Sequence, residues 1–86
     1  MNRDEVLDTA KNIVSGDRHQ DYGDAAENFY RIAAGWQVIL GTDVTLTEVA
    51  LCMDWVKTAR LIQSPDHADS WVDKAGYSAL GAEVAD

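Results

Sequence analysis

Three polar side chains recur at every fourth position near the end of the chain, in a spacing that suits cation binding. Asp69, Asp73 and Tyr77 are four residues apart. In a helix, this spacing places them within about 80° of one another. The same side of the helix carries residues expected to pack inward, namely Gly76, Leu80 and Val84. Two carboxylates therefore lie at the start of a helix face that continues into the core. Carboxylates on such a face need a cation as partner.

Two cations earlier in the chain offer such a partner. Arg60 falls within an apolar helical arc, and Lys57 lies at the edge of that arc. The short turn at 63–66 predicts that the helices on either side are antiparallel neighbours. This arrangement brings Lys57 and Arg60 level with Asp69 and Asp73, and each pair of charges suits its local helix dipole.

The charged cluster has two interpretations. In the structural one, Asp73 and Arg60 belong to a partly buried ion-pair network that fixes the register of the hairpin, with little net stabilisation. In the functional one, Asp69 and Asp73 bind Mg²⁺, Lys57 and Arg60 contact a phosphate, and Tyr77 lies beside the ligand. The sequence leaves both open.

A second polar cluster lies in the loop before the next helix. Its residues are Asp17, Arg18, His19, Asp21 and Tyr22. Because loops on rigid scaffolds often carry binding sites, Arg18 and Tyr22 are candidate ligand contacts. Asp24 and Asn28 at the following helix start are further candidates, although Asp24 and Glu27 project away from the apolar stripe. The competing interpretation is a solvated linker with a capped helix start.

Charge and composition limit the possible partners. The 86 residues include 15 acidic and 7 basic side chains, giving a formal charge of −8. This charge repels nucleic-acid phosphates, so we expect no duplex nucleic acid partner. No segment approaches the apolar length of a membrane span, which predicts a cytoplasmic protein that does not bind membranes. The single cysteine, Cys52, is expected in the core.

No arrangement of residues indicates covalent catalysis. The chain contains no nucleophile elbow, phosphate-binding glycine loop or Cys-His-Asp pattern. Catalytic residues therefore stay unidentified, and the sequence favours a protein that is not an enzyme.

Helical periodicity predicts one all-α domain over 1–86, a compact four-helix bundle. Asn2, Asp24 and either Thr45 or Thr47 are expected caps, Gly16 and Gly41 are expected stops, and the fourth helix runs from about His67 to Ala85. The apolar stripe of the second helix consists of Ala25, Phe29, Ile32, Trp36 and Ile39. That of the third consists of Val49, Cys52, Met53, Val56 and Ala59.

Three tryptophans give this short chain more large apolar surface than a small monomer easily buries. We therefore expect a homo-oligomer. Trp55 and Trp71 are the interface candidates, because both lie at or beyond the edge of the inward arcs.

Several segments resemble a domain of unknown function found in short phage and prophage proteins. They are "MNRDEVLDTAKNIVSGDR", "DYGDAAENFYRIAAGW" and "VALCMDWVKTARLIQSPDHADSWVDKAGYSALGAE", which cover nearly the whole chain. More distantly, the basic helix followed by spaced acids and a tyrosine is similar to phage nucleotide-modification-associated domains and to MazG-like all-α pyrophosphatases. That similarity implies magnesium and a nucleotide. The Glu-x-x-Glu motif of the pyrophosphatases is missing here, and Asp24-x-x-Glu27 is a poor substitute.

Two functional hypotheses follow. In the first, a small oligomeric phage-type protein binds a nucleotide or phosphate ligand through its Asp/Lys/Arg cluster, with Mg²⁺ on Asp69 and Asp73. In the second, an acidic interaction protein without catalysis binds a basic host protein and inhibits a host defence complex, as an anti-CRISPR protein would.

Overall fold

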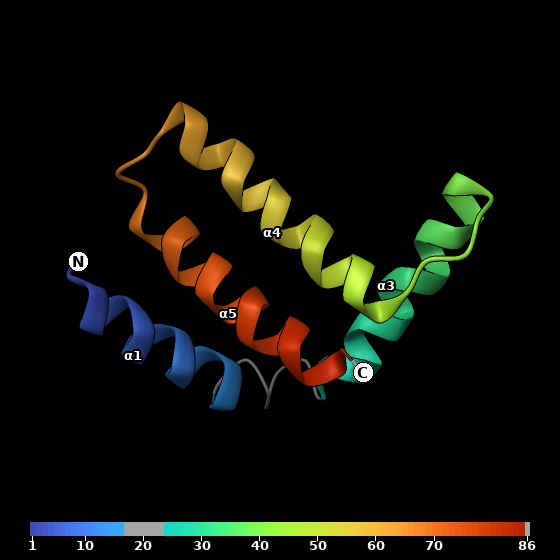
Figure 1. Ribbon diagram of the computed structural model, residues 1–86, viewed down its shortest axis with the longest axis horizontal. Helices are drawn as coiled ribbons and strands as arrows, with labels where there is room; N and C mark the ends of the chain where they lie inside the picture. The colour runs from blue at the N-terminus through green and yellow to red at the C-terminus, as the bar shows by residue number, and fades with distance from the viewer. Residues whose placement is uncertain (17–23, 86) are drawn as a thin grey trace.

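Four α-helices form the described part of the chain, residues 1–16 and 24–85 of a computed structural model, and neither range contains a strand. The helices are α1 (Arg3–Ser15), α3 (Ala25–Leu40), α4 (Leu46–Gln63) and α5 (Ala68–Val84). The predicted all-α class is therefore confirmed. Figure 1 shows α4 and α5 side by side in opposite directions, with α1 along the other side of α5 and α3 near the start of α4.

The helix starts follow local capping chemistry. Asn2 accepts a hydrogen bond from the Glu5 backbone at 2.8 Å, and Glu5 reaches back to the Asn2 backbone. Thr45 and Glu48 form the same reciprocal box at the start of α4, with distances of 2.9 and 3.1 Å. Each box satisfies backbone N–H groups that have no partner inside the helix. Asn2 and Thr45 are confirmed as caps.

The helix ends also agree with the sequence prediction. Gly41 ends α3 in the left-handed conformation, with φ of 69°, which favours glycine because it has no Cβ. Gly16 ends α1, and α4 stops at Gln63, two residues before Pro65. The backbone before a proline disfavours the helical conformation.

The main core lies where α3 crosses the α4–α5 hairpin. The Phe29 ring stacks on the Tyr77 ring, with centroids 6.5 Å apart. The other buried members of this core are Ala33, Val49 and Ala50. The half-buried side chains that complete it are Ile32, Trp36, Val44, Leu46, Met53, Leu80 and Val84. The core thus joins three helices through one aromatic pair.

Two glycines let neighbouring helices approach α5 closely. A Cβ at Gly81 would lie 3.1 Å from the Ala50 Cβ on α4. A Cβ at Gly76 would lie 3.3 Å from a Val14 methyl on α1. Both separations are tighter than ordinary contact, so residues with larger side chains would push the helices apart.

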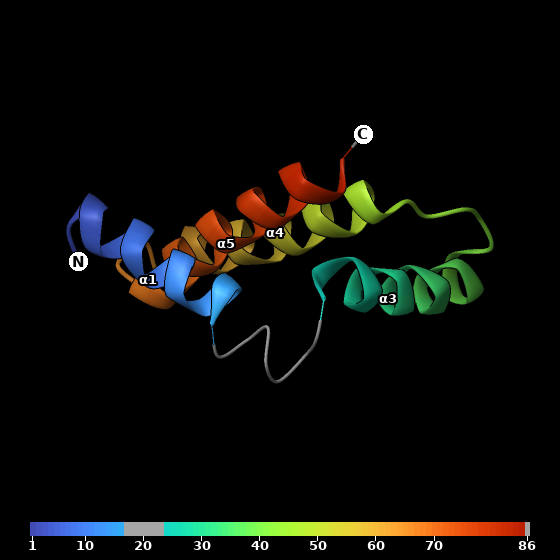
Figure 2. The ribbon, with the colours of Figure 1, turned by 90° about the horizontal axis from the view of Figure 1, so that it is seen from below.

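The arrangement is more open than the predicted compact bundle. Among the described helices, α1 contacts α5 but neither α3 nor α4 (Figure 2). The radius of gyration is 13.4 Å, against about 12 Å for a compact domain of this length. Helices α1, α5 and α4 therefore form a layer, and α3 covers one end of it.

Because α3 covers only one end of this layer, several residues that the sequence predicted to be in the core are exposed. Cys52, Val56 and Ala59 on α4 are exposed, because α3 packs against the start of α4 and leaves the rest of the stripe open. Ile39 is exposed as well, since the last turns of α3 extend away from the other helices (Figure 2). No helix in residues 1–16 and 24–85 is long and apolar enough to span a membrane.

Candidate functional site

The α4–α5 hairpin joins part of the predicted charged cluster. Lys57 on α4 and Asp73 on α5 form an ion pair of 3.1 Å. Their side chains are 17% and 29% exposed, so the pair is half-buried. The predicted register of the hairpin is confirmed, and the inward position of Asp73 is explained by a cation on the facing helix.

The predicted pairing of Asp73 with Arg60 is wrong. Arg60 is exposed, and within the described residues it forms no ion pair. The reason is its position on α4: it shares the face that α3 covers near Val49, whereas Lys57 lies on the side that faces α5. Beyond the reach of α3, that face of α4 meets solvent.

A second ion pair, which the sequence analysis missed, lies one helical turn away. Lys74 Nζ is 3.0 Å from both carboxylate oxygens of Asp54 and also donates to the Thr58 hydroxyl. This pair was predictable from the hairpin register. Asp54 lies about one turn before Lys57 on α4, which places it opposite Lys74. Two lysines at the hairpin interface are thus already neutralised by aspartates.

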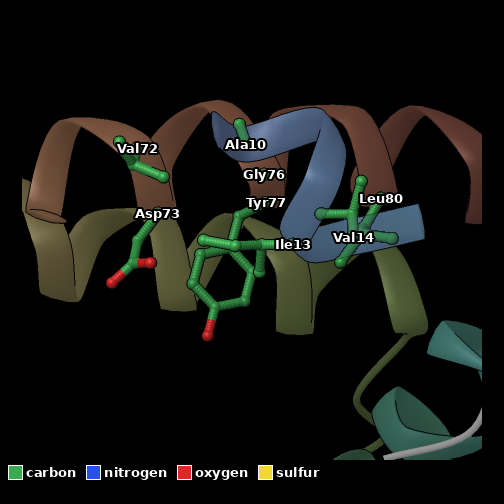
Figure 3. Close-up of a pocket in the computed structure, with 8 residues that line it drawn as sticks. All are labelled: Ala10, Ile13, Val14, Val72, Asp73, Gly76, Tyr77 and Leu80. Carbon is green, nitrogen blue, oxygen red and sulfur yellow. The ribbon is translucent and has the colours of Figure 1, made fainter. Parts of the chain in front are cut away.

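Asp73 also borders a small apolar hollow between α1 and α5 (Figure 3). The hollow is lined by Ala10, Ile13, Val14, Val72, Asp73, Gly76, Tyr77 and Leu80. Its volume is about 10 Å³, which is close to the space that one water molecule needs. Tyr77 is buried, with its ring stacked on Phe29. A nucleotide does not fit this hollow in the present arrangement.

Broader depressions elsewhere are shallow and open. One, of about 340 Å³ between α4 and α5, is lined by Thr47, Ala50, Leu51, Asp54, Tyr77, Ser78, Gly81, Ala82 and Ala85. It contains an acid but no lysine or arginine. Another, of about 400 Å³ against α3, has Arg31 together with Glu27 in its lining. Neither provides the set of cations that a phosphate group would require.

The two candidate metal ligands differ in their surroundings. Asp69 is exposed in the first turn of α5, whereas Asp73 is paired with Lys57. The described residues contain no group of three or more His, Cys, Asp or Glu side chains that could hold a metal ion. Mg²⁺ on Asp69 and Asp73 stays a prediction, and it would have to draw its other ligands from water and a bound phosphate.

The other candidates lie apart from this pair. Asp24 is exposed at the N-cap of α3, where its side chain makes no capping hydrogen bond, and Asn28 is half-buried one turn later. Arg18 and Tyr22 lie outside the described residues. Their predicted ligand roles stay predictions.

Comparison with known proteins places the chain in a family. Residues 5–85 match the model of a domain of unknown function, DUF6378. The Gene 55 protein of Mycobacterium phage L5 is 43% identical over 76 residues, which are 87% of this chain and 49% of the relative. The Gene 55 protein of Mycobacterium phage D29 is 34% identical over 73 residues, or 85% of this chain and 48% of the relative.

The chain spans about half the length of these curated relatives. No solved structure matches it. The phage origin of both relatives agrees with the resemblance noted in the sequence. The chain therefore belongs to the DUF6378 family, a domain of unknown function that it shares with mycobacteriophage proteins.

Proposed function

We propose that this chain is an acidic interaction protein that binds a basic surface of a host protein. The observation that carries the proposal is the contrast between inward and outward charges. Lys57 and Lys74 are each held by an aspartate at the hairpin interface, whereas many carboxylates are exposed. The chain has a formal charge of −8, so its exposed carboxylates attract a basic partner.

Exposed carboxylates of the described residues gather where α1 and α5 begin. Both helices start at the same end of the molecule (Figure 1). The exposed carboxylates there are Asp4, Glu5, Asp8, Asp66 and Asp69. The exposed cations Arg3 and Arg60 share this end. Such a surface favours fast, salt-sensitive association with a basic partner. Because the relatives are phage proteins, we expect the partner to be a bacterial protein, such as a component of a defence complex.

A phosphate-binding role is the second candidate. It is favoured by Arg60, which is exposed and forms no ion pair within the described residues, about one turn from Lys57. A guanidinium in this state is available for a phosphate group. The neutralised Lys57 and the water-sized hollow beside Asp73 make this role the weaker of the two.

Two charge variants test the proposal. Asp4→Asn/Asp8→Asn/Asp69→Asn removes three charges at the acidic end, and Asp24→Asn/Glu27→Gln/Asp43→Asn removes three exposed charges elsewhere. Tagged wild type should retain a basic protein from mycobacterial extract at low salt and release it at high salt. The first variant should lose this protein, and the second should keep it. Equal retention by both variants, or no retained protein, contradicts the proposal.

A thermal-shift titration with nucleotides, with and without Mg²⁺, tests the second candidate. A ligand at 100 times its dissociation constant adds about 2.7 kcal/mol of stability. A shift in wild type that Arg60→Met abolishes would favour phosphate binding over the acidic-surface proposal.

A further inference from the structure

An exposed apolar surface runs along α4 on the side away from α5, and its edge at Leu51 borders the depression between α4 and α5. Its six exposed side chains, here called the outer face, are Leu51, Cys52, Trp55, Val56, Ala59 and Ile62. At 100° per residue they span an arc of about 140°. Within 51–62, the charged residues Asp54, Lys57 and Arg60 fall on other sides of the helix, whereas the exposed Glu48 lies in the same arc one turn before Cys52. A stripe of this width usually faces a packing partner.

The accessible surface of the whole chain is larger than that of a typical monomer of its mass. The chain exposes 5998 Å², whereas a folded monomer of its mass exposes about 5,000 Å². The excess of about 1,000 Å² is similar to the roughly 800 Å² that each partner contributes to a stable interface. The excess belongs to the whole chain, and the exposed apolar end of α3, with Val38 and Ile39, contributes to it together with the outer face. The chain thus has enough open surface for a dimer interface.

The chemistry of the outer face favours a second copy over a basic partner. Its centre carries no carboxylate that could attract lysine or arginine, so the acidic end and the outer face suit different partners. An apolar patch that pairs with itself across a two-fold axis needs no charge complement. Depletion of charged residues is also typical of the buried centre of an interface.

We infer that two copies of this chain associate through their α4 outer faces, with the two α4 helices antiparallel. A two-fold axis near Trp55 and Val56 places the small residue Cys52 opposite Ala59 of the other copy. Leu51 and Ile62 then pack at either end. This direction brings each Glu48 to the helix end that carries Arg60 of the other copy, whereas parallel helices would bring like charges together.

A pair of matched leucines tests the interface. Leu51 on the outer face and Leu40 at the end of α3 are both 64% exposed. Light scattering of wild type at micromolar concentration should give twice the 9.4 kDa chain mass. Leu51→Glu should raise the dimer dissociation constant at least tenfold, and Leu40→Glu should leave it unchanged. Ile62→Glu provides a second outer-face variant if Leu51→Glu fails to fold by circular dichroism.

A monomeric wild type would overturn the inference, and so would a dimer that Leu51→Glu and Ile62→Glu leave intact. Oxidative cross-linking tests the antiparallel direction. Positions 52 and 59 of one helix lie about 10 Å apart, too far for a disulfide within one chain. Diamide should therefore link two copies of Ala59→Cys through the native Cys52 much faster than it links wild type. Equally fast linking of wild type would contradict the antiparallel arrangement.

Discussion

The two halves of α4 present the same helical face to different surroundings. In the first half, Val49 is fully buried beneath α3, and Met53 is half-buried. In the second half, Val56 is 50% exposed, and Arg60 points into solvent. The apolar pattern of the sequence continues over both halves of α4, but α3 covers only the first half. Periodicity identifies residues that share a face, whereas the length and position of a neighbouring helix decide which of them are buried.

The largest expected effect is the loss of stability when a valine in the first half of α4 is shortened to alanine. The same substitution in the second half is the control. Val49→Ala removes two buried methyl groups and leaves a cavity, which should lower the free energy of unfolding by about 2 to 3 kcal/mol. Val56→Ala should change it by less than about 0.5 kcal/mol. Urea denaturation should be measured in the Leu51→Glu background, so that self-association does not protect Val56.

Equal losses at the two positions would contradict the difference between the halves. They would mean that the second half of α4 is covered within one chain. The Leu51→Glu protein without either valine change is the reference for both measurements.

The next effect concerns the side of α4 that faces α5. Lys57 and Asp73 are half-buried and 3.1 Å apart, so a double-mutant cycle with Lys57→Met and Asp73→Asn should give a coupling energy of about 1 kcal/mol. The matched cycle with Arg60→Met and Asp73→Asn should give a value near zero. Chemical denaturation without nucleotide or Mg²⁺ measures both cycles. A larger coupling for Arg60 would restore the pairing first expected from the sequence.

Local features of the fold were predictable from the sequence, because they depend on neighbouring residues. The caps at Asn2 and Thr45, the left-handed end at Gly41 and the hairpin at Pro65 are of this kind. The hairpin register also predicted that a cation on α4 meets Asp73. Each of these features needs information from only a few positions or one short turn.

Features that depend on the placement of α3 were not predictable in the same way. Cys52 and Val56 have core-like residue types, yet both are exposed because α3 ends its contact with α4 before reaching them. The preference of Asp73 for Lys57 over Arg60 has the same origin. Which of two neighbouring cations faces α5 depends on how α4 is rotated between its two packing partners.

The smallest expected effect lies at the start of α4 and depends on pH. Hydrogen bonds from the Thr45 backbone and side chain lower the pKa of Glu48 below its ordinary value of 4.5. A carboxyl with a lowered pKa in the folded state stabilises the fold above its unfolded pKa, and this contribution is lost as pH falls through the folded value. Wild type should therefore lose more stability below pH 4.5 than Glu48→Gln does.

Urea denaturation from neutral pH down to about pH 3 measures this difference, with Glu83→Gln as an exposed control on α5. Both α3 and the Thr45–Glu48 box stabilise the first half of α4. Protonating Glu48 therefore destabilises the half of the helix that packs against α3. Parallel pH curves for wild type and Glu48→Gln would show that the cap contributes no charge-dependent stability. The first half of α4 would then be stabilised by burial beneath α3 and not by the charge of Glu48.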